Sequence, residues 1–79
     1  MTPTNQEIAQ KLREHATKLA RNGDNLYRVR AFRQAAMAVL ALPEEVAVIV
    51  AADGRRALER LPGIGKSLAG TIAGYLNAA

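Results

Sequence analysis

The sequence predicts an all-α fold, a compact bundle of four to five short helices that forms a single domain over residues 1–79. Alanine, the best helix former, supplies 16 of the 79 residues. Only three residues are aromatic, whereas strands favour aromatic and β-branched side chains, so the composition argues against a β-sandwich. Apolar residues recur at helical spacing between short runs of turn residues, a pattern typical of short helices that pack against one another.

The first helix is predicted to begin after Thr4, because Thr4 and Glu7 have the T-x-x-E spacing of a capping box. Ile8 and Leu12 begin an apolar series at helical spacing, which makes this helix amphipathic. Gly23 is expected to end it in the left-handed conformation that glycine adopts easily.

A second helix is expected from Asp24 or Asn25, either of which can cap it, to about Leu42. Steps of about 100° per residue gather one apolar set on one side of this helix. That set consists of Leu26, Val29, Phe32, Ala36, Val39 and Leu40. Pro43 cannot continue the helix and suits the first turn of the next one.

Residues 43–52 are predicted to form a short third helix. Glu44 and Glu45 suit its first turn because their negative charge complements the helix dipole. Residues 46–50 could form a buried strand by residue type, but a single strand would have no partner. The turn residues 53–54 would end this helix.

Two further helices are expected, one over about residues 55–60 and a final one from residue 66 to about 76. The final helix places four apolar side chains on one face, namely Leu68, Ile72, Tyr75 and Leu76. Gly70 and Gly74 leave its outer face nearly bare, and such a face would admit either a DNA backbone or another helix.

Composition excludes several classes of protein. Without cysteine the chain can form no disulfide, no thiolate zinc site and no cysteine nucleophile, and its one histidine leaves too few ligands for a transition-metal site. The longest charge-free run, residues 67–79, is shorter than the ~20 residues that span a bilayer, and the first ten residues lack a signal-peptide pattern. With a net charge of +4, the chain is expected to be a cytoplasmic, basic helical domain that binds no membrane.

The most specific motif is Leu61-Pro62-Gly63-Ile64-Gly65-Lys66. Its glycines let the backbone turn tightly while Ile64 points inward as an anchor. The turn leads into a helix N-terminus, where the main-chain N–H groups of Gly63, Gly65 and Lys66 can bind an anion such as a phosphodiester. The glycine spacing is too short for a Walker A loop, and no strand precedes the motif as a dinucleotide fingerprint would require. The plain alternative is an ordinary tight connection between two helices.

The motif resembles the hairpin of the helix-hairpin-helix DNA-binding motif. Together with residues 25–36, it resembles the small N-terminal domain of family X DNA polymerases, the group that includes DNA polymerase beta, especially its bacterial members. The resemblance covers roughly residues 8–76. It implies a SAM-like helical bundle that holds one DNA strand by its phosphates without reading base sequence, in DNA repair or replication. It also implies a monomer, with a polymerase or repair protein as a further partner.

Carried over residue by residue, the resemblance assigns a 5′-phosphate pocket for gapped DNA to Arg28, Phe32 and Ser67, with Tyr27 at a base-stacking position. Phe32 lacks a hydroxyl and Ser67 lacks a charge that the family usually carries there, which weakens the pocket. The resemblance also implies a monovalent cation, Na⁺ or K⁺, on main-chain carbonyls, and no other cofactor is expected. Those carbonyls belong to Glu59, Leu61 and Ile64.

The residues expected to contact DNA phosphates are therefore Arg28, Arg30, Gly63, Ile64, Gly65, Lys66 and Ser67, with support from Arg55 and Arg56. Of Tyr27 and His15, only Tyr27 has an open role. Tyr27 suits either stacking on a base or a place in the core, whereas His15 lies on the apolar stripe of the first helix and is expected to pack there.

Catalysis by this chain alone is not expected. The resemblance places the family's lyase lysine at Thr71, whose hydroxyl cannot form an imine, and the chain lacks the carboxylate cluster of nucleotidyl transfer. Two alternatives to DNA binding remain: a protein-interaction module that uses the Gly70 and Gly74 face or residues 46–50, and a residual deoxyribose-phosphate lyase.

Overall fold

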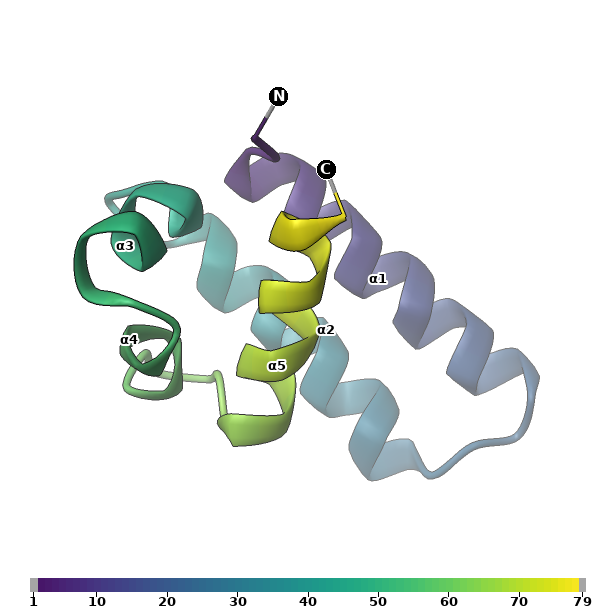
Figure 1. The fold of residues 1–79 in the computed structure, drawn as a ribbon. Coiled ribbons are helices and arrows are strands. Elements are labelled where there is room, and N and C mark those ends of the chain that lie inside the picture. The colour runs from purple at the N-terminus through teal and green to yellow at the C-terminus, as the bar shows by residue number, and fades with distance from the viewer. Residues whose placement is uncertain (1, 79) are drawn as a thin grey trace.

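Five helices occupy residues 2–78, the part of the chain that the computed structural model describes, and no strand occurs in this range (Figure 1). They are α1 (Asn5–Arg21), α2 (Leu26–Leu40), α3 (Val46–Asp53), α4 (Arg56–Glu59) and α5 (Lys66–Asn77). The predicted all-α fold is confirmed. None of these helices is long and apolar enough to span a bilayer within the described range.

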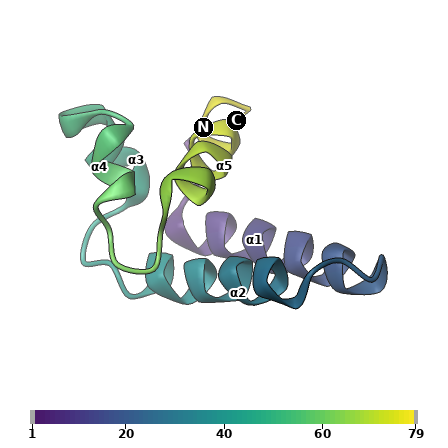
Figure 2. The ribbon, with the colours of Figure 1, turned by 90° about the horizontal axis from the view of Figure 1, so that it is seen from below.

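Helices α1 and α2 lie side by side and antiparallel, and α3, α4 and α5 lie on one side of this pair (Figure 2). The capping box at the start of α1 is confirmed. The Thr4 hydroxyl accepts the Glu7 N–H at 3.2 Å, and the Glu7 carboxylate accepts the Thr4 N–H at 3.0 Å. Hydrogen bonds with Thr4 lower the pKa of Glu7. The bond from the Thr4 backbone contributes most, and the bond with the Thr4 side chain comes second. Gly23 follows the helix with a φ of 71°, as predicted.

The core lies where α5 crosses the α1–α2 pair. Its larger side chains come from all five helices and the hairpin, and they include Ile8, Leu12, Val29, Phe32, Val39, Val46, Leu58, Ile64 and Ile72. Alanines also belong to the core, and Ala16, Ala35, Ala36 and Ala69 have no exposed surface. The hairpin between α4 and α5 packs against α2 at Ala38, whose Cβ would lie 3.1 Å from a Cβ on Gly63.

Two residues of the predicted apolar face of α2 are exposed instead. Leu26 is 68% exposed and Leu40 is 43% exposed. The buried arc of α2 centres close to Phe32, and at ~100° per residue Leu26 lies about 120° from that side chain and Leu40 about 80° from it. The predicted arc was therefore rotated toward Leu26 and Leu40, and it left out Ala35, which is buried.

The third helix starts later than predicted. Glu44 and Glu45 precede α3, which begins at Val46, so they do not form its first turn. The cause is a cluster of hydrogen bonds at Asn5, whose side chain accepts the Val46 N–H at 2.7 Å and donates to the carbonyls of Glu44 and Val39. In return, the Glu45 carboxylate accepts the Asn5 N–H at 3.1 Å. The first turns of α1 and α3 therefore cap each other, and Asn5 is 7% exposed.

Helix α2 ends at Leu40, two residues before the predicted end. Pro43 explains the difference, because a proline disfavours helical backbone in the residue before it. Asn25 rather than Asp24 caps the helix, since its side chain accepts the Tyr27 N–H at 2.7 Å. Residues 46–50 are helical, which excludes the strand alternative for this segment.

Candidate nucleic-acid interface

The hairpin between α4 and α5 is a tight turn over residues 61–64. Pro62 precedes Gly63, whose φ is 81°, and the Ile64 N–H donates to the Leu61 carbonyl at 3.1 Å. Proline followed by a glycine with positive φ is the signature of a type II turn. The turn directs Ile64 into the core, where it is 3% exposed. The predicted tight turn and its inward anchor are confirmed.

The two glycines of the motif lie in different surroundings. A Cβ on Gly63 would lie 3.1 Å from the Cβ of Ala38, so this glycine packs against α2. Gly65 has extended backbone, with φ −91° and ψ −178°, and a Cβ there would have open space around it. Only Gly63 is required by the turn. Gly65 instead leaves the start of α5 uncovered, which differs from the prediction that both glycines shape the turn.

The N-terminus of α5 presents unpaired main-chain donors. Gly65 is the cap residue and provides no side-chain hydrogen bond to the first turn. Within residues 2–78, the N–H groups of Gly65, Lys66 and Ser67 have no hydrogen-bond partner in the backbone, and all three residues are exposed. These donors and the positive end of the helix dipole favour an anion at this position.

A surface cavity of about 470 Å³ lies next to this helix end. It is lined by three segments that are distant in the sequence: His15 of α1, four residues of α2, and residues 65–68 and 71 at the start of α5. The α2 residues are Tyr27, Arg28, Ala31 and Phe32. The structure therefore brings together Arg28, Phe32, Ser67 and Tyr27, the four positions to which the resemblance assigns 5′-phosphate binding and base stacking.

His15 and Phe32 stack within this lining. Their ring centroids lie 4.4 Å apart with 3° between the ring planes. Phe32 is 7% exposed and His15 is half-buried. The prediction that His15 packs on the apolar side of α1 is confirmed. The stacked rings form part of the cavity wall, and Arg28 and Lys66 supply its positive charges.

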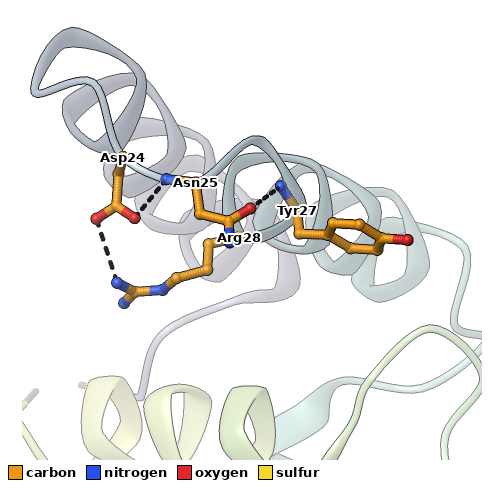
Figure 3. A network of polar contacts seen from close by, with 4 residues as sticks. All are labelled: Asp24, Asn25, Tyr27 and Arg28. Carbon is orange, nitrogen blue, oxygen red and sulfur yellow. Dashed lines mark hydrogen bonds and ion pairs between the residues drawn. The ribbon is translucent and has the colours of Figure 1, made fainter.

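Arg28 is held by the loop before α2 (Figure 3). Its guanidinium lies 3.2 Å from the Asp24 carboxylate, and the other oxygen of that carboxylate accepts the Asn25 N–H at 2.6 Å. The pair is partly exposed, with 57% of the Arg28 side chain accessible, so its contribution to stability is small. Asp24 does not itself line the cavity, but its negative charge lies beside the guanidinium that does. A phosphate that contacts Arg28 therefore approaches Asp24, whose acidic side chain no basic or glycine-rich motif in the sequence indicates.

Tyr27 points away from this ion pair in Figure 3 and is 85% exposed. The alternative that Tyr27 belongs to the core is therefore wrong. Its ring is available to stack on a planar group.

Two of the remaining predicted residues, Arg30 and Arg55, lie outside this cavity. Arg30 is exposed on α2 but does not line the cavity. The Arg55 guanidinium lies over α5, because a Cβ on Gly70 would be 2.8 Å from one of its nitrogens. Gly70 is therefore partly covered, which corrects the prediction of a bare face at this residue, whereas Gly74 is exposed and open.

A second cavity, of about 430 Å³, lies at the end of α4 and is lined by Arg56, Glu59, Arg60 and Lys66. Lys66 lines both cavities and so connects their positive charges across the hairpin. Arg60 was not among the predicted site residues. Its place one residue before the hairpin motif is the signal that could have found it.

The carbonyls that the resemblance assigns to a monovalent cation lie in α4 and the hairpin. The Leu61 carbonyl oxygen already accepts a hydrogen bond from the Ile64 N–H, which leaves one of its two lone pairs for an ion. Glu59 is the last residue of α4, and Ile64 follows Gly63 in the turn. The cation stays a prediction. Among the described residues no cluster of His, Asp or Glu side chains could hold a metal ion.

The family model of the helix-hairpin-helix domain matches residues 3–79 of the chain. A search of curated proteins finds no match. Helix-hairpin-helix domains generally bind DNA without sequence specificity, which agrees with the open helix end and the positive charges around it.

Proposed function

Because the chain belongs to the helix-hairpin-helix domain family, we propose that it binds DNA through backbone phosphates and without reading base sequence. The observation that carries the proposal is the start of α5, where the N–H groups of Gly65, Lys66 and Ser67 are unpaired beside two cavities that carry positive charge. Main-chain donors recognise a phosphate equally well beside any base, so contacts of this kind confer no sequence preference.

The finer proposal is a preference for gapped or 5′-phosphorylated DNA. A terminal phosphate carries more charge than an internal one and can enter a concave site that a continuing strand must pass over. The cavity between α2 and α5 offers Arg28 and Lys66 for such a group, with the Ser67 hydroxyl beside them. Tyr27, exposed at the same cavity, is placed to stack on an unpaired base of the gap.

The proposed binding is weak and depends strongly on salt. Four basic residues line the two cavities, namely Arg28, Arg56, Arg60 and Lys66. If three or four of them each neutralise a phosphate, the binding constant falls about 40- to 150-fold between about 50 and 200 mM salt. The cellular role, DNA repair or replication beside a polymerase or repair protein, rests on the resemblance to family X polymerases.

We further propose that the chain alone is not a lyase. Thr71 lines the cavity at the position of the family's lysine, and its hydroxyl donates to the Ser67 carbonyl at 3.3 Å. Lys66 is the amine in the same cavity, and it is exposed rather than desolvated. Lys11 lies in a separate cavity, over the Tyr75 ring at 5.6 Å. The test is borohydride trapping on abasic DNA, and a covalent adduct that Lys66→Ala abolishes would establish the rival lyase.

Fluorescence anisotropy with four labelled DNAs tests the proposed binding: a gapped duplex with a 5′-phosphate, the same duplex without it, an intact duplex and a single strand. We expect binding to all four at low salt and the highest affinity for the phosphorylated gap. Equal affinity for the two gapped duplexes would overturn the end preference alone. No binding to any of the four at low salt would overturn the function itself.

A further inference from the structure

The outer side of α2 carries a stripe of exposed side chains that the DNA site does not use. Leu26 is 68% exposed, Met37 is 63% exposed and Leu40 is 43% exposed. Arg30 and Arg33 are exposed between them. The residue steps along this series are 4, 3, 4 and 3, so the five side chains lie along one line of the helix. We call this line the outer stripe of α2.

The outer stripe is largely open in the described part of the chain, and Leu40 at one end is the most covered of its three apolar members. In Figure 2 the other four helices all lie to one side of α2. The hairpin contacts α2 at Ala38, about 120° around the helix from the centre of the stripe. Within residues 2–78, neither Arg30 nor Arg33 forms an ion pair, since the salt bridge in this range joins Arg28 to Asp24. The stripe is therefore both unpartnered and separate from the candidate DNA interface.

Single exposed apolar residues are normal on protein surfaces, but an aligned set has a different meaning. Three of the five large apolar side chains that are most exposed in the described residues lie on this stripe. Apolar anchors at helical spacing are how one helix docks along another. Met37 adds a flexible side chain that adapts to a partner surface.

We propose that the outer stripe of α2 docks an amphipathic helix of a partner protein that carries acidic residues opposite Arg30 and Arg33. The apolar ends of the stripe would bury against apolar residues of that helix, and the two guanidinium groups would pair with its carboxylates. Because the stripe and the hairpin lie on different sides of α2, the domain can hold DNA and this partner at the same time.

Repulsion between like charges argues against a second copy of this chain as the partner that docks on the outer stripe. In an antiparallel pair of stripes Arg33 would lie opposite Arg33, and in a parallel pair both arginines would face their equivalents. Either arrangement places like charges together in the middle of the contact. DNA is also a poor fit, because phosphates along the stripe would meet exposed leucine and methionine side chains at its ends.

The test uses two synthetic helical peptides of about 18 residues, alike except on one stripe. The acidic peptide has leucines at both ends of that stripe and two glutamates in the middle, and the basic peptide has lysines in place of the glutamates. Binding is measured by fluorescence anisotropy up to about millimolar domain, with amide chemical shifts to locate the contact. Arg33→Glu is compared with Arg13→Glu, which makes the same change of charge at an exposed position on α1.

We expect the acidic peptide to bind and to shift the amides of α2. Arg33→Glu should weaken it about fivefold to tenfold and favour the basic peptide, whereas Arg13→Glu should change the affinity less than about twofold. The proposal fails if the acidic peptide does not bind, or if both peptides bind equally well. It also fails if the chain dimerises through the stripe in sedimentation experiments, or if Arg33→Glu weakens DNA binding more than Arg13→Glu does.

Discussion

Gly63, in the hairpin, and Gly65, the cap residue of α5, differ in whether the fold requires a glycine. Gly63 has a φ of 81° and lies close to the Cβ of Ala38, so both its backbone and its surroundings require glycine. Gly65 has extended backbone and open space around it, so the fold tolerates a side chain there. Residues 63–64, which we call the inner half of the motif, therefore maintain the fold. Residues 65–66, the outer half, are free to approach a ligand. The two roles can be separated by substitution.

The largest expected effect lies on the inner half, at Ile64. This side chain is 3% exposed in the core, and Ile64→Ala should lower the free energy of unfolding by about 2–5 kcal/mol. In a domain of this size such a loss removes much of the total stability. Urea denaturation followed by circular dichroism measures it. A loss below about 1 kcal/mol would mean that the hairpin is not anchored as described.

The next effect is on Gly63. Gly63→Ala forces an L side chain into a left-handed conformation and against α2, and we expect a loss of about 1–3 kcal/mol in stability. Adding Ala38→Gly removes the 3.1 Å contact but leaves the backbone strain, so the double variant should differ from the sum of the single variants. Strict additivity in the same denaturation assay would rule out the Gly63–Ala38 contact as a source of the loss.

On the outer half, Lys66→Ala should leave stability nearly unchanged and weaken DNA binding about fivefold to tenfold. The Lys66 side chain is exposed and lines both basic cavities, so its loss removes charge without removing packing. The slope of log K against log salt should also become shallower by about one. An unchanged slope would show that Lys66 does not neutralise a phosphate.

A smaller effect of opposite sign is expected at Asp24. Asp24→Asn keeps an oxygen that can accept the Asn25 N–H but removes the negative charge 3.2 Å from the Arg28 guanidinium. DNA affinity should rise about twofold to threefold, because a phosphate at Arg28 no longer meets a nearby carboxylate. A decrease would instead assign Asp24 the role of holding Arg28 in position for the phosphate.

The sequence predicted those features that depend on neighbouring residues. The capping box of Thr4 and Glu7 and the Pro62–Gly63 turn are local, so residue type and spacing were sufficient. Contacts between distant segments were beyond such reasoning. The Asn5 side chain forms hydrogen bonds with residues that follow it by 34 to 41 positions in the sequence. No local sequence pattern predicts that Asn5 caps α3.

The same distinction holds in the candidate site. Residues at the hairpin and on α2 were identified separately, but only the folded chain shows that Arg28 and Lys66 line one cavity with Tyr27. The apolar arc predicted for α2 included Leu26 and Leu40, which belong to the exposed outer stripe. Residue type and spacing do not distinguish these two leucines from the buried ones, because their exposure depends on which helices cover each side of α2.

The central claim, that a phosphate approaches the main chain at the start of α5, is tested most directly by the DNA affinity of Gly65→Ala. Alanine suits the backbone at this position and meets no neighbouring atom, so the fold should persist with a stability change within about 1 kcal/mol. Gly74→Ala, on the same helix and also in open space, is the matched control. We expect Gly65→Ala to weaken binding to the 5′-phosphorylated gapped duplex about fivefold or more and Gly74→Ala to leave it unchanged. Equal affinities for Gly65→Ala and the unaltered chain would contradict the account.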